Sequence, residues 1–377
     1  MYQRTIEESI KNSLFKGKIV IIYGPRQVGK TTLSKKIMNE SGVKTLYIQA
    51  DITSSRELIS KPEPKQLKSV FGDAELVVID EAQNIQNIGL ILKTFVDTYP
   101  EIQIIAIGSS SFELANKIKE PLTGRVYEYF LYPLSIEEIS NNSLLEYKKI
   151  EDFIFKFGFY PGIINKGTDE ARKDLETIQE SYLYKDIFLF ENIKKPEMLH
   201  KLITLLAFSI GSNLSVNSLA REIGTTAKTV DRYLDLLEKM FVIKRLYGFS
   251  RNLSNEIKKG FKVYFVDIGI RNSVIKNHNE ISHRNDIGGL FENLFVIERI
   301  KYQNNHNIQA NRYFWRTYNN VEVDYIEEKN GELLAFECKY KERSSRGLKI
   351  FQEEYKNSKS YLVHKENIFE SVGSIFS

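Results

Sequence analysis

The 377-residue chain contains a single cysteine, Cys338, so no intramolecular disulfide bond is possible. It also lacks an apolar run near the ~18 residues that a membrane-spanning helix requires. The nearest run, Leu202–Ile210, is interrupted by Thr204 and Ser209. The N-terminal sequence MYQRTIEESIKN is polar and amphipathic, unlike a signal peptide. We therefore expect a cytoplasmic protein that does not contact a membrane.

A strong net charge is also absent, since the formal value is only +4. The composition, 42% hydrophobic and 27% charged, is typical of a globular protein, and the length favours two or three domains. The charge is unevenly distributed. The segment Lys194–Lys262 has 13 Lys and Arg against 6 Asp and Glu, a net charge of +7. Such a segment is either a contact surface for an acidic polymer such as DNA or an ordinary solvated surface.

The most informative motif is Gly24–Thr31, GPRQVGKT, which has the GxxxxGK[ST] pattern of a phosphate-binding loop. It follows a strand predicted at Lys18–Tyr23 and precedes a helix predicted at Thr31–Asn39. Glycine lets the loop turn its N–H groups toward phosphate oxygens, and the helix N-terminus attracts the same anion. Lys30 is predicted to contact the β- and γ-phosphates, and Thr31 to hold Mg²⁺. The predicted nucleotide-binding residues are Gly24, Pro25, Arg26, Gln27, Val28, Gly29, Lys30, Thr31 and Thr32.

A second part of a nucleotide site follows the apolar run Leu76–Ile79, which predicts a strand buried on both faces of a parallel sheet. The run ends in Asp80 and Glu81. Asp80 is predicted to bind Mg²⁺ through water, and Glu81 to act as the general base of hydrolysis. ATP and Mg²⁺ are the expected cofactors. A guanine nucleotide is disfavoured because Asn116–Lys119, NKIK, lacks the aspartate of an NKxD motif.

Two further catalytic roles are predicted around the next strand, Ile102–Ile107. Ser109 or Ser110 follows this strand and either senses the γ-phosphate or caps a helix. Arg125 and Arg26 are candidates for an arginine finger, which neutralises charge in the transition state. Arg125 is preferred because it follows the sensor segment. A finger acting on a neighbouring subunit would require a homo-oligomer, whereas one acting within the chain would not.

The middle of the chain has the outline of a helix-turn-helix. Apolar side chains recur at helical spacing over Val216–Ile223 and again over Ala227–Met240, with Gly224 between them. The run Phe241–Tyr247 is interpreted as a wing strand. The residues expected to face DNA lie near the start of the second helix: Thr226, Lys228, Thr229 and Arg232. The alternative is a module for mechanical coupling or protein contact.

The dipeptide Asn330-Gly331 predicts a β-hairpin with a two-residue turn. If Lys329 pairs with Glu332, the register places Asp324 opposite Glu337 and Glu322 opposite Lys339. Alternation then predicts one apolar face of the hairpin and one charged face. The apolar face would carry Val323, Tyr325, Leu334, Phe336 and Cys338, and the charged face Glu322, Asp324, Glu337 and Lys339.

Two carboxylates directly opposite one another repel unless a cation lies between them. Hard oxygen ligands favour Mg²⁺ or Mn²⁺ at Asp324 and Glu337. Lys339 could orient a metal-bound water or help to deprotonate it, as in a metal-dependent phosphodiesterase. In the alternative interpretation, Glu322 and Lys339 form a surface salt bridge beside a solvated Asp324.

These motifs together resemble predicted AAA+-superfamily ATPases that have an AAA_14 N-terminal domain and a DUF4143 C-terminal domain. The resemblance covers nearly the whole chain. It is carried by Asp80–Gln83, Leu122–Arg125, Gly158–Pro161, Tyr182–Ile187, Lys262–Gly269, Gly288–Asn293 and Trp315-Arg316. One departure is Phe159, which stands where the family has the second glycine of its GG-x-P motif.

The resemblance implies that the C-terminal region is similar to the PD-(D/E)XK restriction-endonuclease fold. This would place Glu292 on the first helix, near Asp324, Glu337 and Lys339. Such folds also bind DNA without cleaving it. The predicted α/β organisation is therefore a P-loop ATPase domain of the additional-strand type (1–140), a helical connector (141–193), a winged helix-turn-helix (194–258) and a nuclease-like domain (259–377).

The predicted function is ATP hydrolysis coupled to a DNA-binding domain with possible metal-dependent nuclease activity. The alternative is an ATP-dependent switch or remodelling protein. In that case the C-terminal domain binds DNA or a protein partner without cleavage.

Overall fold

The computed structural model describes most of the chain: residues 2–60, 63–108, 122–181, 196–250, 260–317, 319–342 and 344–373. The chain divides into two compact units. The first comprises Met1–Pro133 with Lys239–Phe241, and the second Leu134–Glu238 with Val242–Ser377. Within the described residues, no helix is both long and apolar enough to cross a membrane.

The first unit contains a five-stranded parallel sheet in the order β2-β3-β4-β1-β5. Its elements are α1 (Glu7–Lys11), β1 (Ile19–Tyr23), α2 (Lys30–Glu40), β2 (Thr45–Gln49), α3 (Thr53–Ile59), α4 (Pro64–Phe71), β3 (Leu76–Asp80), η1 (Ala82–Asn84), α5 (Ile88–Thr98), β4 (Gln103–Gly108) and β5 (Val126–Phe130). Strand β4 lies between β1 and β3, which confirms the predicted additional-strand type of P-loop fold.

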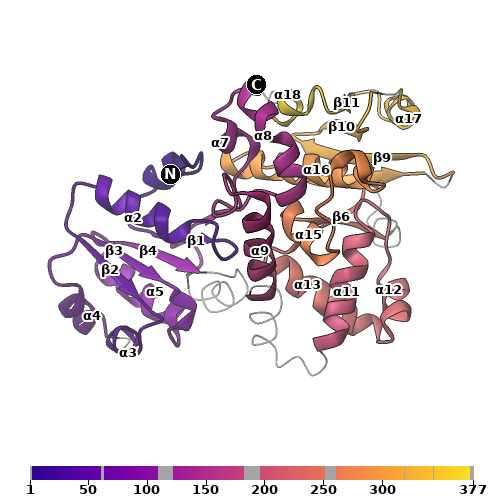
Figure 1. The fold of residues 1–377 in the computed structure, drawn as a ribbon. Helices are drawn as coiled ribbons and strands as arrows, with labels where there is room; N and C mark the ends of the chain where they lie inside the picture. The colour runs from indigo at the N-terminus through magenta and orange to yellow at the C-terminus, as the bar shows by residue number, and fades with distance from the viewer. Residues whose placement is uncertain are drawn as a thin grey trace. The chain divides into compact units, whose positions relative to one another are not determined.

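Burial explains why these runs form strands. All residues of β1, β3 and β4 are buried, as expected for apolar strands covered on both faces. Figure 1 shows α2 and α5 on opposite sides of the sheet. Since the strands are parallel, the loop after β1 and the residues that end β3 meet at one edge of the sheet.

The second unit combines helices with a mixed six-stranded sheet in the order β11-β10-β9-β8-β6-β7. Its helices are α7 (Ile136–Ser140), α8 (Leu144–Phe157), α9 (Thr168–Ile178), α11 (Pro196–Phe208), α12 (Val216–Ile223), α13 (Ala227–Lys239), α15 (Ile268–Val274), η3 (Ile281–His283), α16 (Ile287–Asn305), α17 (Arg346–Glu354) and α18 (Ile368–Gly373). Its strands are β6 (Ile243–Gly248), β7 (Phe261–Phe265), β8 (Asn311–Arg316), β9 (Glu322–Lys329), β10 (Glu332–Cys338) and β11 (Ser358–Val363).

The two helices of the predicted helix-turn-helix are present as α12 and α13. The strand predicted as a wing is β6, which pairs antiparallel with β7, while Leu214 forms a bridge with Phe261 of β7. Strand β6 also pairs with β8 and so belongs to the six-stranded sheet. The boundary predicted between residues 258 and 259 therefore separates two paired strands, and both predicted domains lie within the second unit except for Lys239–Phe241.

The β9–β10 hairpin has the predicted register. Asn330 and Gly331 have φ values of 52° and 83°, as a type I′ turn requires, and Lys329 pairs with Glu332. The predicted division into one apolar and one charged face is wrong, because both faces are buried. Phe336 packs against Phe295 of α16 on one side, and the other side contributes to a separate cluster that contains Trp315.

Val323 was predicted to share a face with Tyr325 and Phe336, whose rings contact one another. It lies instead in the second cluster, together with Ile326, Leu333 and Ala335. A register irregularity between β8 and β9 lies beside it, where Tyr313 and Trp315 change partners. Strict alternation therefore does not hold along β9, and the hairpin separates two apolar layers.

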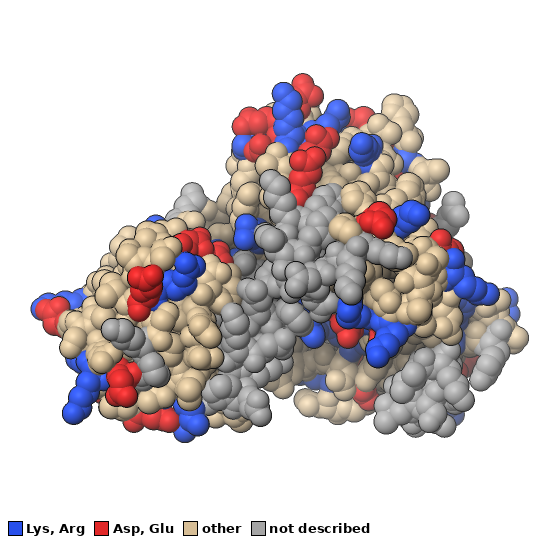
Figure 2. Space-filling view, turned by 90° about the horizontal axis from the view of Figure 1, so that it is seen from below, with Lys and Arg blue, Asp and Glu red and all other residues tan. Residues whose placement is uncertain are grey.

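Charges of both signs cover the surface. On the face shown in Figure 2, Lys and Arg side chains are interspersed with Asp and Glu, and neither sign dominates its described part. Within the central segment, three of its six acidic residues gather around one arginine. Arg245 of β6 lies 2.6 Å from Glu238 and 3.3 Å from Asp231, and it also pairs with Asp235. These three carboxylates are already counted in the net charge of +7, which the pairing leaves unchanged.

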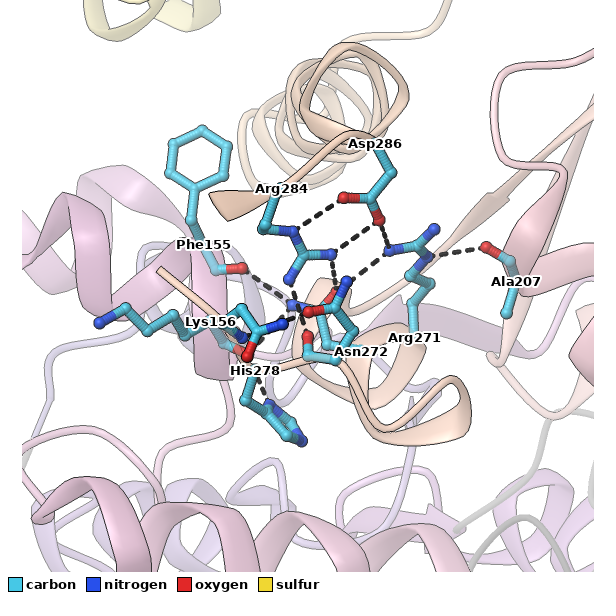
Figure 3. Close-up of polar contacts among 10 residues, drawn as sticks. Phe155, Lys156, Ala207, Arg271, Asn272, His278, Arg284 and Asp286 are labelled. Atoms are coloured by element: carbon cyan, nitrogen blue, oxygen red, sulfur yellow. Dashed lines mark hydrogen bonds and ion pairs between the residues drawn. The ribbon is translucent and has the colours of Figure 1, made fainter. Parts of the chain in front are cut away.

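A buried ion network anchors the start of α16 (Figure 3). Asp286 precedes the helix and accepts hydrogen bonds from Arg284 Nε at 2.9 Å and Arg284 Nη2 at 2.8 Å. The guanidinium of Arg271 in α15 also binds Asp286, while its Nε donates to the carbonyl of Ala207 in α11 at 2.8 Å. One carboxylate therefore joins three helices of the second unit.

The same network extends to α8 (Figure 3). Arg284 Nη2 donates to Asn272 Oδ1 at 2.9 Å, and Asn272 Nδ2 donates to the Phe155 carbonyl at 2.9 Å. His278 Nδ1 lies 3.1 Å from the Lys156 carbonyl. Helices α8, α11 and α15 are thus tied to the start of α16, the helix that carries Glu292.

The replacement Asp286→Ala should lower the free energy of unfolding of the second unit by about 3 kcal/mol, because it leaves two buried arginines without their carboxylate. The sole tryptophan, Trp315, is buried in this unit, so its fluorescence during urea unfolding reports the change. Asp152→Ala, at an exposed position of α8, is the matched control.

The same carboxylate predicts a pH dependence. Burial raises the pKa of Asp286, but hydrogen bonds from Arg284 and Arg271 outweigh it and hold the pKa below its ordinary value of 3.8. Its contribution to stability is therefore complete above that value and is lost as the pH falls through the lowered pKa. The Asp286→Ala variant should show a weaker loss of stability in acid than the wild type. An equal loss in both proteins would contradict this role.

Candidate functional sites

The backbone of the first site is the loop between β1 and α2. Glycine is required at position 24, because a Cβ there would lie 2.2 Å from the carbonyl oxygen of Leu131. Gly29 has a φ of 97°, a left-handed conformation that glycine adopts without steric cost, and Lys30 begins the helix. The loop thus leads directly into a helix N-terminus, as the motif predicts.

Lys30 is folded back onto this loop. Its Nζ donates to the carbonyls of Gly24 at 2.9 Å and Pro25 at 2.8 Å, and the residue is only 6% exposed. Burial lowers the pKa of Lys30 to about 8, although Glu81 and Asp80 act in the opposite direction. The ammonium group is therefore held by neutral carbonyls, and an arriving phosphate would favour its charged form.

The predicted magnesium ligands lie together. Thr31 Oγ1 donates to Asp80 Oδ2 at 2.7 Å, and Asp80 Oδ1 accepts from the backbone N–H of Glu81 at 3.0 Å. Asp80 is 6% exposed, and the hydroxyl of Tyr47 in β2 also donates to it. A carboxylate beside a threonine hydroxyl is a hard-oxygen set that fits Mg²⁺.

Glu81 stands at the end of β3 with a φ of 51°, a left-handed conformation that costs free energy for a residue other than glycine. Its carboxylate accepts a hydrogen bond from Gln83 Nε2. Glu81 thus directly follows Asp80 at the end of β3, and their roles as general base and metal ligand stay predictions.

Sequence reasoning missed two residues that support this site. Tyr47 holds Asp80 from the neighbouring strand, and nothing in the local pattern of β2 indicates that role. Arg4 is buried, and its guanidinium donates to the carbonyl of Val28 at 2.8 Å and to that of Tyr132 at 2.6 Å. Arg4 thereby ties the phosphate loop to the segment after β5.

The arginine-finger prediction for Arg125 is wrong for a nucleotide bound to the same chain. The Arg125 carbonyl accepts from the N–H of Ile19 at 3.0 Å, at the amino end of β1, whereas the phosphate loop follows its carboxyl end. The five residues of β1 put roughly 16 Å between them. Arg125 pairs instead with Asp97 at 2.6 Å. Action on a neighbouring subunit stays a prediction.

The remaining residues predicted to act in catalysis are two serines and a second arginine. Ser109 and Ser110 lie outside the described residues. Arg26 is exposed on the phosphate loop, and its charge helps to lower the pKa of the buried Lys30. Of the two arginines predicted as fingers, Arg26 is therefore the one that lies on the phosphate loop of its own chain.

The second candidate site lies within the second unit. Lys262 of β7 is fully buried, and its Nζ lies 2.9 Å from Glu292 Oε1, 2.5 Å from Glu322 Oε1 and 3.2 Å from Asp324 Oδ1. Glu292 comes from α16, and Glu322 and Asp324 come from β9. We call Lys262 and its three carboxylates the Lys262 cluster. It brings together Glu292 and Asp324, as predicted.

Neighbouring groups hold these carboxylates in place. The Tyr264 hydroxyl donates to Glu292 Oε1 at 2.6 Å, and the backbone N–H of Cys338 donates to Asp324 Oδ2 at 2.9 Å. Gly211 leaves room for Glu292, since a Cβ at that position would lie 2.8 Å from Glu292 Oε2. The cluster is therefore a rigid arrangement.

Glu337 and Lys339 lie beside the cluster. Lys339 Nζ is 2.7 Å from Glu337 Oε1, while Glu337 Oε2 is buried and has no hydrogen-bond partner within the described part of the chain. Burial, and then the charge of Asp324, raise the pKa of Glu337 to about 7. The alternative of a surface Glu322–Lys339 salt bridge beside a solvated Asp324 is wrong, because Asp324 is buried and Glu322 binds Lys262.

The cluster does not fit a divalent metal. Burial by itself would lower the pKa of Lys262, but Glu292 and the other nearby acidic groups outweigh it and raise the pKa well above its ordinary value. An ammonium group thus occupies the space between the carboxylates. Within the described ranges, no set of three or more His, Cys, Asp or Glu side chains has the geometry to hold a metal ion. Sequence reasoning quoted Lys262 only as part of a family motif and gave it no role in the site, although a charged residue in the apolar strand FKVYF is a detectable signal.

Comparisons with known protein families identify separate domains in the N-terminal and C-terminal parts of the chain. Residues 16–140 match the family described as AAA domain, AAA_14, and residues 287–376 match a domain of unknown function, DUF4143. Both were predicted, and both are confirmed. Residues 148–281 match another domain of unknown function, DUF8612, which was not predicted and which crosses the proposed boundaries at 193 and 258.

The chain is also similar to uncharacterized proteins from distant organisms. It is 24% identical over 339 residues to one from Mycobacterium tuberculosis, covering 89% of this chain and 74% of that protein. It is 24% identical over 371 residues to one from Haemophilus influenzae, covering 90% and 87%. A third relative, from Methanocaldococcus jannaschii, is 26% identical over 311 residues, covering 71% and 64%.

Among solved structures, the ORC2 protein of Aeropyrum pernix in its ADP form is 14% identical, with a TM-score of 0.35. The match covers 72% of this chain and 91% of that one. A TM-score of this size does not by itself indicate a shared fold.

The position of Arg125 leads to a prediction about hydrolysis. In dilute solution, where the protein is monomeric, Arg125→Ala should leave ATP turnover per subunit unchanged, because this side chain does not reach the phosphate loop of its own chain. Turnover is measured as phosphate release over a range of protein concentrations. Arg26→Ala is the comparison and should reduce turnover at every concentration. A loss of turnover in monomeric Arg125→Ala would contradict the assignment.

Proposed function

Because the chain carries an AAA domain over residues 16–140, we propose that it binds and hydrolyses MgATP. We further propose that the second unit binds DNA without cleaving it. The observation that carries the first proposal is the meeting of Lys30, Thr31 and Asp80 at the carboxyl edge of the parallel sheet, with Glu81 beside them. These side chains come from two separate motifs, and the fold brings them to one place.

Each of these residues has a definite task in the proposed reaction. Lys30 exchanges its two carbonyl acceptors for oxygens of the β- and γ-phosphates, and Thr31 with Asp80 holds the metal. Mg²⁺, when bound, neutralises charge on the phosphates. Glu81 accepts a proton from the attacking water, and Gln83 orients the Glu81 carboxylate through the hydrogen bond that it donates.

Two substitutions separate ATP binding from ATP hydrolysis. Lys30→Ala should abolish tight binding, because it removes the cation that contacts the phosphates. Glu81→Gln should preserve binding but reduce turnover by roughly 10²- to 10⁴-fold, as expected for loss of a general base. Binding is measured by titration with a fluorescent ATP analogue, and turnover by phosphate release.

Two exposed positions serve as controls for these variants: Lys65→Ala and Glu57→Gln should behave like the wild type. Unchanged nucleotide affinity in Lys30→Ala would refute the binding site. Normal turnover in Glu81→Gln would place the general base elsewhere.

The proposal that DNA is the partner is supported by α12 and α13. Helix α13 begins after an exposed Thr226, whose hydroxyl accepts from the N–H of Thr229 at 3.2 Å, and Lys228 and Arg232 are also exposed there. In helix-turn-helix proteins, this part of the second helix contacts bases and phosphates. The mixed charges on the face shown in Figure 2 are equally compatible with a protein partner, which is the alternative. The predicted cytoplasmic location and homo-oligomer remain predictions.

Salt dependence distinguishes the two partners. We expect duplex DNA to bind with an affinity that falls steeply as salt is raised, because phosphate contacts release counterions. Lys228→Ala should weaken binding and reduce the slope of log K against log salt by about one. Lys359→Ala, an exposed lysine on β11, is the control and should change neither quantity. Absence of DNA binding at low salt would favour a protein partner.

Nuclease activity is the second candidate, favoured by the proximity of Glu292, Asp324 and Glu337, with Lys339 bonded to Glu337. The Lys262 ammonium among these carboxylates argues against it. We therefore expect no cleavage of linear or single-stranded DNA with Mg²⁺ or Mn²⁺, with or without ATP, as judged on denaturing gels. Cleavage by the wild type that disappears in Lys339→Ala would instead establish a nuclease.

A further inference from the structure

We propose that the ammonium group of Lys262 occupies the position, between the carboxylates of the Lys262 cluster, that a divalent metal ion would otherwise take. In this proposal the wild-type unit has no metal site at Glu292 and Asp324, and removal of the lysine creates one. The proposal is independent of ATP hydrolysis, since every residue of the cluster belongs to the second unit.

Lys262 Nζ is surrounded by carboxylates, and it donates hydrogen bonds to two of them, Glu292 and Asp324. Three carboxylates lie at 2.5, 2.9 and 3.2 Å, and a lysine ammonium has three N–H donors. Mg²⁺ would need oxygens at 2.0–2.1 Å from a common point. Such a point lies within the volume that the ammonium fills, so the lysine and the metal exclude one another.

Lys262 cannot move aside easily. The residue is fully buried, and its neighbours in β7, Phe261 and Val263, are buried as well. The ring of Phe314 in β8 lies 5.7 Å from Nζ, close enough for a cation–π contact. Strand β7 is paired with β6 along its whole length, which fixes the backbone from which the side chain extends.

The charges around the cluster are nearly balanced without a metal. Four carboxylates gather here, those of Glu292, Glu322, Asp324 and Glu337. The facing cations are Lys262, Lys339 at Glu337, and Arg316, whose Nε lies 3.7 Å from Glu322 Oε2. Four negative charges against three positive ones leave a net charge of −1. A divalent ion would add two positive charges to a set that is already nearly compensated.

Tyr264 and Cys338 also face the cluster, and neither supplies a positive charge. The Tyr264 hydroxyl donates to Glu292, and the Cys338 backbone N–H donates to Asp324. Both are neutral donors that stabilise the carboxylates further. Glu292 and Asp324 thus each accept one hydrogen bond from Lys262 and one from a neutral donor, while Glu337 Oε2 has no hydrogen-bond partner among the described residues.

The first test uses the wild-type chain. Binding of Mn²⁺ alone, without nucleotide, is measured from the electron paramagnetic resonance signal of the free ion, in the wild type and in Asp324→Asn. Asparagine keeps an oxygen that can accept from Cys338 but removes the negative charge. We expect the two proteins to bind the same number of ions. Loss of one Mn²⁺ site in Asp324→Asn would overturn the proposal, because it would show that the wild type holds a metal there.

The second test removes the lysine. Lys262→Ala vacates the space and leaves three carboxylates without their cation, so it should bind one more Mn²⁺ than the wild type. The additional site should disappear in the double variant Lys262→Ala with Asp324→Asn. Added Mn²⁺ should raise the unfolding midpoint of Lys262→Ala, read from Trp315 fluorescence, and not that of the wild type. Lys359→Ala is the control for loss of a lysine and should gain no site.

The outcomes of the second test are also decisive. A folded Lys262→Ala that gains no Mn²⁺ site overturns the proposal. A variant that folds only when Mn²⁺ is present supports it. If Lys262→Ala fails to fold under any condition, the proposal is still tested by comparing the number of Mn²⁺ ions bound by the wild type and by Asp324→Asn, because both of these proteins retain the lysine.

Discussion

The common direction of the five strands in the first sheet decides which side chains can meet. Parallel strands end at the same edge, so the loop after β1 and the acidic pair that ends β3 converge although some 50 residues separate them. The same constraint keeps the start of β5 at the opposite edge, where Arg125 pairs with Asp97. The phosphate loop and the acidic pair of the first unit thus lie at the same edge of its sheet. The nucleotide chemistry that we propose depends on this geometry more than on any single hydrogen bond.

In the second unit, the dominant requirement is the pairing of buried charges. Taking an ion out of water costs several kcal/mol unless a partner compensates it. Arg299 and Glu327 are both fully buried and lie 2.6 Å apart. Lys262, like Asp286 in the network at the start of α16, collects several partners from different elements. Because these ions bind partners far away in the sequence, they join the helices and the sheet in one arrangement.

Sequence reasoning succeeded where the signal is local. The phosphate loop, the acidic end of β3 and the Asn330-Gly331 turn are short motifs whose geometry follows from their own residues, and the hairpin register followed from the turn by counting. It failed where a long-range partner decides. The faces of β9 could not be assigned, because both sides meet apolar layers that come from elsewhere in the chain. The contacts of Lys262 were not predicted for the same reason, since its three carboxylates come from two elements that are distant in the sequence.

The scarcity of two residue types makes this chain unusually accessible to spectroscopy. The single thiol, that of Cys338, lies in β10, and burial raises its pKa well above the ordinary value, so little reactive thiolate is present at neutral pH. The only tryptophan lies in the same unit. A cysteine introduced on the surface of the AAA domain would therefore accept a fluorophore selectively. Energy transfer from Trp315 to that fluorophore would then follow the separation of the two units through a nucleotide cycle, with no native residue to remove beforehand.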